Sequence, residues 1–173
     1  MRAKYSYLFA FCCLQFTFLM GQTDEMDIYL PKNNPKVQKV EQIFQHIVKV
    51  ANLSENNELS VKVENSYLYG NSPVGTTRGL AQFRQKENLI VIEEKAYDSC
   101  MIWGGENAIA YLLAHEFGHY LIYQEKGIKF PHSDTLREAD ADLRGNLYAR
   151  IAGYNPCNKF EYVLNNLYTR TKW

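Results

Sequence analysis

Residues 106–125 are apolar almost all round, and within them stand His115, Glu116 and His119 in the order His-Glu-x-x-His. A helix that is hydrophobic on every side is buried in the middle of a domain. Two residues spaced i and i+4 lie on one face of a helix, about one turn apart. The sequence therefore predicts a buried central helix that presents two imidazoles side by side.

This spacing of residue types meets the needs of a zinc centre. Two imidazoles one turn apart can bind a single zinc ion, while Glu116, next to that face, can reach a water on the metal without binding the metal itself. Zinc lowers the pKa of bound water to about 7, and a nearby carboxylate can take its proton during attack on a carbonyl. The alternative is a buried helix with incidental histidines, whose ring nitrogens must then find other partners.

A catalytic zinc ion usually has three protein ligands, and Glu138 is the predicted third. The interval after His119 allows a reversal through a loop at 127–134 and a second helix lying across the first. Asp142, four residues after Glu138, would share its face and could orient one of the histidines by a hydrogen bond. Thr135 and Glu138 also fit a capping box, in which the carboxylate only closes the start of the helix. Asp142 and His132 are the next candidates for the third ligand.

Hydrolysis also needs a donor that faces the tetrahedral oxyanion. The sequence does not choose among the candidates on or near the second helix, and each could equally be structural: His132, Arg144, Tyr148 and Tyr154. The segment 88–93 could be an edge strand along which a peptide lies, or an ordinary interior strand.

The remaining pattern predicts an α+β order of helix, strands and then three helices. Asn34 and Pro35 indicate a helix start, and the helix should end near 54–57. Alternation at 59–63 and apolar stretches at 80–84 and 88–93 predict three or four strands. The helices that follow are expected at 106–125, about 135–152, and from Asn155-Pro156 to about Leu167.

The N-terminus resembles a targeting segment. Arg2 and Lys4 precede an apolar run from Leu8 to Met20, which predicts a signal peptide over 1–21, a flexible mature N-terminus over 22–33 and one domain over 34–173. We therefore expect a secreted or periplasmic protein without a transmembrane segment in the mature chain. In an oxidising compartment Cys100 and Cys157 could form a disulfide, or remain two separate thiols.

The amino-acid composition argues against one class of partner. The formal net charge is zero and no basic stripe stands out, so nucleic acid is not an expected partner. Protein or peptide substrates are the partners that the motif predicts.

The motif residues carry a family resemblance. His115-Glu116-x-x-His119 with a downstream Glu138 resembles the gluzincin zinc peptidases. The stretch from Glu138-Ala139-Asp140-Ala141-Asp142 to Gly153-Tyr154-Asn155-Pro156 is similar to the HtpX-like and CAAX-prenyl-endopeptidase family. The resemblance implies a zincin-like fold with a small, mostly antiparallel sheet packed on the motif helix. It also implies Glu138 as ligand, with Asp142 as its outer partner.

These observations predict a metalloendopeptidase with one Zn²⁺ per chain and Glu116 as general base. An aminopeptidase is the nearest alternative among enzymes. A zinc-stabilised binding or inhibitory module that lacks catalysis is the alternative from another class.

Overall fold

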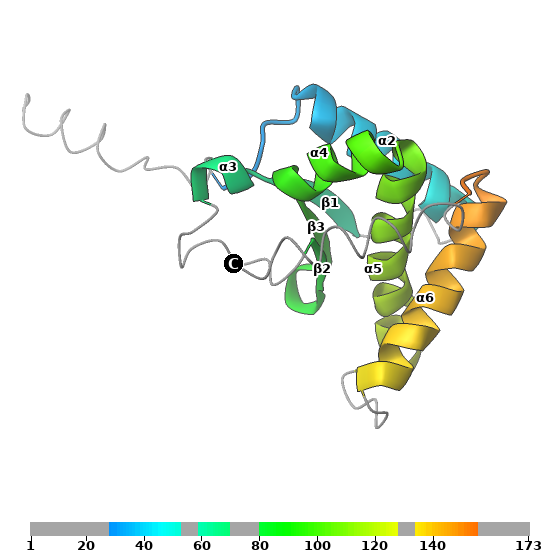
Figure 1. The fold of residues 1–173 in the computed structure, drawn as a ribbon. Coiled ribbons are helices and arrows are strands. Elements are labelled where there is room, and N and C mark those ends of the chain that lie inside the picture. Colours follow the sequence, from blue (N-terminus) through cyan, green and yellow to red (C-terminus); the bar gives the residue numbers. More distant parts are fainter. Residues whose placement is uncertain (1–27, 53–58, 70–79, 128–133, 156–173) are drawn as a thin grey trace, which may run out of the picture.

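The computed structural model describes residues 28–52, 59–69, 80–127 and 134–155 of the chain. They form an α+β arrangement in which helices pack against a three-stranded mixed sheet (Figure 1). In chain order the elements are α2 (Pro35–Val50), β1 (Ser60–Glu64), α3 (Ser66–Tyr69), β2 (Ala81–Arg84), the 3₁₀ turn η2 (Gln85–Glu87), β3 (Leu89–Glu93), α4 (Glu94–Trp103), α5 (Glu106–Lys126) and α6 (Asp134–Ile151).

Helix α2 begins where the sequence predicts. The side chain of Asn34 accepts a hydrogen bond from the Lys36 backbone N–H at 2.9 Å, and Pro35 occupies the first turn. The helix ends at Val50, earlier than expected, because Asn52 adopts a left-handed backbone conformation with φ of 51°. Its buried face supplies five residues to the core: Val37, Val40, Ile43, Phe44 and Ile47.

The sheet has the order β1-β3-β2, with β3 parallel to β1 and antiparallel to β2. The prediction of a mostly antiparallel sheet is therefore wrong in this detail. Of the two alternatives for the segment 88–93, the structure has the interior strand: β3 is the central strand, and four of its five residues are buried. A continuous apolar run of this kind is typical of a strand covered on both faces. Among the described strands, β2 is the edge that faces away from β1.

The described part of the N-terminal segment lies on β1. Tyr29 forms an antiparallel bridge with Glu64, and the Leu30 N–H donates to the Val63 carbonyl at 2.9 Å. Residues 28–33, which the sequence assigns to a flexible N-terminus, thus include a short stretch paired with the sheet. Residues 22–27 and the predicted signal peptide lie outside the described residues.

Helix α4 is not predicted by the sequence pattern. It follows β3 directly and buries Ala96, Tyr97 and Cys100. It ends at the Gly104-Gly105 pair, and Gly105 has a φ of 62°. This conformation suits glycine and lets the chain turn sharply from α4 into α5.

Helix α5 lies at the centre of the molecule, as predicted. It packs on α2, on the sheet and on α4, and its buried residues include Ile109, Leu113 and Phe117. In Figure 1, α6, coloured yellow to orange, runs alongside α5 in the opposite direction, so that its first turns lie beside the last turns of α5. None of the helices within the described ranges has the length and apolar character needed to cross a bilayer.

Candidate metal centre

The site depends on an unusually close crossing of α5 and α6. A Cβ atom placed on Gly118 would overlap the carbonyl oxygen of Ala141, and one placed on Gly145 would overlap that of Ala114. Glycine at these two positions lets the two backbones touch, as small residues do at other close helix contacts. The crossing holds the start of α6 against the face of α5 that carries the histidines.

Three donor atoms converge at this contact. Nε2 of His115 and Nε2 of His119 lie 3.1 Å apart. The Oε2 atom of Glu138 lies 3.1 Å from the first nitrogen and 3.3 Å from the second. His115, His119 and Glu138 are thus the three ligand candidates that the sequence analysis selects. The carboxylate of Glu138 contacts both imidazoles, beyond what a helix-capping role requires.

Asp142 makes the contact predicted for it, with His115. Its Oδ1 lies 2.8 Å from the Nδ1 atom of His115, and the same oxygen accepts a hydrogen bond from the hydroxyl of Tyr111. A carboxylate at Nδ1 keeps the proton on that nitrogen and leaves the Nε2 lone pair for another partner. In the neutral ring, Nε2 of His115 would then carry the lone pair that a metal ion can use.

The donor set fits a divalent metal ion. With zinc–ligand bonds of roughly 2.0–2.1 Å, two ligand atoms of a tetrahedron lie about 3.3 Å apart. The three observed separations, 3.1, 3.1 and 3.3 Å, match this edge length. Lone pairs and a carboxylate oxygen this close repel one another unless a proton or a cation lies between them. Imidazole nitrogen and carboxylate oxygen are also ligand types that zinc accepts.

Glu116 lies beside this centre and is almost fully buried. Its Oε2 atom accepts the backbone N–H of Phe83, in the edge strand β2, at 2.7 Å. The residue is only 9% exposed, and this hydrogen bond replaces part of the solvation that the carboxylate loses. The bond fixes one carboxylate oxygen against the sheet and leaves the other to accept a proton.

The surroundings shift the pKa values of four side chains: Glu116, His115, His119 and Asp142. Burial raises the pKa of Glu116, against the lowering effects of His115 and of the Phe83 N–H. Burial and the positive charge of His115 lower the pKa of His119. Burial opposes the charged form of His115, but the hydrogen bond to Asp142 and the nearby carboxylates outweigh it and raise the pKa. Burial would raise the pKa of Asp142, but its bonds to His115 and Tyr111 lower it.

The described candidates for the oxyanion donor make their contacts elsewhere. Arg144 is held by Glu125 at 2.5 Å and by Asp140 at 2.9 Å. The ring of Tyr148 packs edge-on against Phe117, and the hydroxyl of Tyr154 lies 3.3 Å from Nδ1 of His46 on α2. His132, the fourth candidate, lies outside the described residues.

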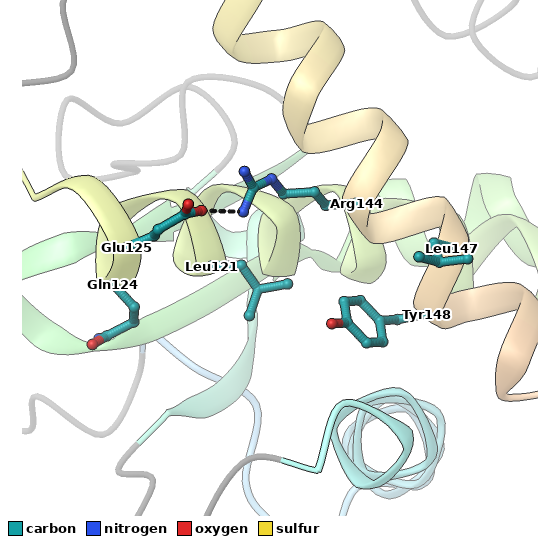
Figure 2. Close-up of a pocket in the computed structure, with 6 residues that line it drawn as sticks. All are labelled: Leu121, Gln124, Glu125, Arg144, Leu147 and Tyr148. Atoms are coloured by element: carbon teal, nitrogen blue, oxygen red, sulfur yellow. Dashed lines mark hydrogen bonds and ion pairs between the residues drawn. The ribbon is translucent and has the colours of Figure 1, made fainter.

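Arg144 and Tyr148 line a separate groove between α5 and α6, with a volume of about 430 Å³ (Figure 2). The figure shows the ion pair of Arg144 with Glu125 on one side and Tyr148 with Leu147 on the other. None of the residues that line this groove belongs to the three-donor cluster. The groove is therefore distinct from the candidate metal centre.

Cys100 is a free cysteine in the buried part of α4, and burial raises the pKa of its thiol to about 12. Its candidate disulfide partner, Cys157, lies outside the described residues, as does the predicted last helix beyond Asn155. The pairing stays a prediction.

Two groups at the site are not predicted from the sequence. Tyr111 stands four residues before His115, on the same helix face, so its position in the sequence was a usable signal. The Phe83 N–H is a backbone group, and only the packing of β2 on α5 brings it to Glu116. No residue pattern within one segment indicates such a contact.

Comparisons of the chain with protein-family models, with curated proteins and with solved structures gave no match.

Proposed function

We propose that this chain is a zinc-dependent peptidase with a zincin-like fold, and that it hydrolyses peptide bonds of protein or peptide substrates. One observation carries the proposal: three ligand-type atoms from α5 and α6 lie within 3.1–3.3 Å of one another. A buried carboxylate, that of Glu116, stands in the same helical turn. A purely structural zinc site would not need that carboxylate.

In this proposal His115, His119 and Glu138 hold one zinc ion per chain. Bound there, zinc supplies a Lewis acid that lowers the pKa of a water molecule to about 7. Glu116 accepts the proton of the attacking water and passes it to the leaving amine.

The edge of β2 offers a place for an extended peptide. The Leu80 carbonyl accepts from the Glu93 N–H at 3.0 Å, so residues 80, 82 and 84 bond to β3 while residues 81 and 83 direct their backbone groups outward. The Phe83 N–H already serves Glu116. A substrate strand pairing with the remaining groups of this edge would place its carbonyl near Glu116. The proposal therefore assigns this role to β2, since the segment 88–93, considered for it in the sequence analysis, is the central strand.

Endopeptidase activity is favoured over aminopeptidase activity. An aminopeptidase needs a further acidic residue to bind the substrate amine. The two acidic residues of α6 at the centre, Glu138 and Asp142, both contact the histidines. The predicted signal peptide and the resemblance to HtpX-like peptidases support a secreted or periplasmic enzyme of this class.

The test compares the processed wild-type protein with Glu116→Gln. We expect about one zinc ion per chain in both proteins, and cleavage of casein or a fluorogenic peptide library by the wild type alone. Glutamine keeps the size and one acceptor oxygen but cannot take the proton. Zinc in both proteins with no cleavage by either supports the zinc-stabilised binding module instead. Absence of zinc from the wild type refutes both functions.

A further inference from the structure

We infer that Tyr111 is a positioning residue for the metal centre, acting through Asp142 on His115. Tyr111 lies four residues before His115 on α5, and Asp142 lies four residues after Glu138 on α6. The tyrosine hydroxyl and the His115 Nδ1 meet at one atom, Oδ1 of Asp142. The three side chains form a chain of contacts that begins in the core and ends at a ligand candidate.

The environment of Tyr111 makes it a rigid anchor. Only 8% of the residue is exposed, and its ring lies nearly parallel to that of His115, at an interplanar angle of 22°. Asp142 is more exposed, with 43% of its side chain accessible. An exposed carboxylate on a helix surface has several rotamers, and a buried hydroxyl donor selects the one that faces His115. Asp142 then fixes both the ring orientation and the tautomer of the histidine.

The contacts have a direct consequence for metal binding. The Nε2 atom of His115 is useful as a ligand only when the proton is held on Nδ1 and the ring is aimed at the site. Without the Tyr111 hydroxyl, Asp142 can turn toward solvent, and His115 loses this constraint. The inference rests on the proposed zinc site, and it requires only that His115 binds metal, not that the protein is catalytic.

The test is the affinity of the processed chain for Zn²⁺ alone, measured by competition with a chromophoric chelator. Tyr111→Phe keeps the ring and removes the hydroxyl. We expect about tenfold weaker binding, at the lower end of the range for outer partners of metal-binding histidines. Tyr97→Phe is the matched control, since Tyr97 is also 8% exposed but lies on α4. We expect its zinc affinity to equal that of the wild type.

A double-mutant comparison separates positioning from general destabilisation. Asp142→Asn should weaken zinc binding, and adding Tyr111→Phe to it should cause little further loss, because the hydroxyl acts through the carboxylate. Wild-type affinity in Tyr111→Phe, or losses that add fully in the double variant, would overturn the inference. Zinc binding with these couplings but without peptidase activity would leave the inference standing and refute the proposed enzyme.

Discussion

The carboxylate of Glu138 is the most exposed of the three candidate ligands, with 48% of its side chain accessible against 19% for His115 and 18% for His119. An exposed carboxylate has no need of two imidazole partners to stay solvated. Its Oε2 atom nevertheless lies within 3.3 Å of both Nε2 atoms. The solvation of Glu138 does not explain this placement, and the proposed shared ion would require it.

Replacement of Glu138 should remove a ligand, whereas replacement of a nearby acidic residue should not. For Glu138→Gln we expect zinc affinity to fall by more than the roughly 10- to 100-fold that outer partners of a ligand cost. Asp140→Asn is the control, because Asp140 lies on the same helix but bonds to Arg144. Chelator competition measures both. Equal losses in the two variants would show an electrostatic effect of α6 rather than direct ligation.

Cys100 should be unreactive in the folded protein. With a pKa of about 12, the thiol is protonated at ordinary pH, and about one molecule in a thousand carries the thiolate at pH 9. Raising the pH from 7 to 9 should therefore leave alkylation of Cys100 by iodoacetamide slow in the native state and fast only in urea. Peptide-level mass spectrometry measures the modification. A recovered peptide in which Cys100 is bonded to Cys157 would contradict this prediction and establish the disulfide.

At the scale of elements, the contact of β2 with α5 sets the position of Glu116. In Phe83→Pro the donor N–H is lost, while proline is tolerated at an outward-facing position of an edge strand. The reference variant is Phe83→Ala, which loses the same ring but keeps the N–H. We expect kcat of Phe83→Pro to be about tenfold below that of Phe83→Ala. A tenfold loss corresponds to about 1.4 kcal/mol, near the lower end for a hydrogen bond to a charged group. Zinc content should not change.

Ala81→Pro is the matched control for that experiment. Ala81 also directs its N–H outward from β3, but it has no part in the bond to Glu116. Because the Ala81 N–H is one of the edge groups that the proposal assigns to substrate pairing, we expect KM to rise while kcat stays near that of the wild type. A loss as large as that of Phe83→Pro would show that proline distorts the strand, and would remove the role of the Phe83 N–H.

The α5–α6 crossing should tolerate no added side chain at its two glycines. Gly118→Ala and Gly145→Ala must each push the helices apart, at a cost of about 1–3 kcal/mol in the free energy of unfolding of the metal-free protein. The shift also moves Glu138 away from the histidines, so zinc affinity should fall as well. Leu143→Ala is the control, because Leu143 is 73% exposed on α6 and should change stability by less than about 0.5 kcal/mol. Urea unfolding and zinc titration measure the two effects.

Local patterns in the sequence predict elements that carry their own signals. The Asn34-Pro35 start of α2, the alternation in β1 and the apolar character of α5 all depend on neighbouring residues, and each is found in the structure. Helix α4 has a weak amphipathic pattern and a start without a side-chain cap, so nothing local marked it. The place of β3 in the middle of the sheet depends on pairing with two distant strands, which a single segment does not encode.

In the candidate site, too, some residues follow from local spacing, whereas the contacts of others depend on how the helices pack. His115, Glu116 and His119 follow from spacing on one helix, and Asp142 follows from spacing relative to Glu138. The oxyanion candidates on or near α6 rest on nearness in sequence alone, and the described ones contact other groups. Rotation of α6 about its axis decides which residues face α5, and Gly118 and Gly145 set that rotation through backbone contact.

For the whole molecule, the question is whether a metal ion would hold the fold together or only complete a site. The core joins α2, the three strands, α4, α5 and, through Ala149, α6, and none of His115, His119 and Glu138 belongs to it. All three candidate ligands come from α5 and α6, which already touch through their backbones. The fold should therefore form without metal, unlike small domains whose folding depends on zinc.

Zinc should accordingly raise the thermal stability of a chain that is already folded. At a free Zn²⁺ concentration about 1,000 times the dissociation constant, binding to the native state alone contributes about 4 kcal/mol. In a domain of this size that corresponds to a rise of roughly 10 °C in Tm. The far-UV circular dichroism at 25 °C should be the same with and without a chelator. Glu138→Gln, with one ligand fewer, should show little rise. Collapse of the far-UV signal on chelation would instead mean that zinc stabilises the fold, which is the behaviour expected of a structural zinc site in a binding module.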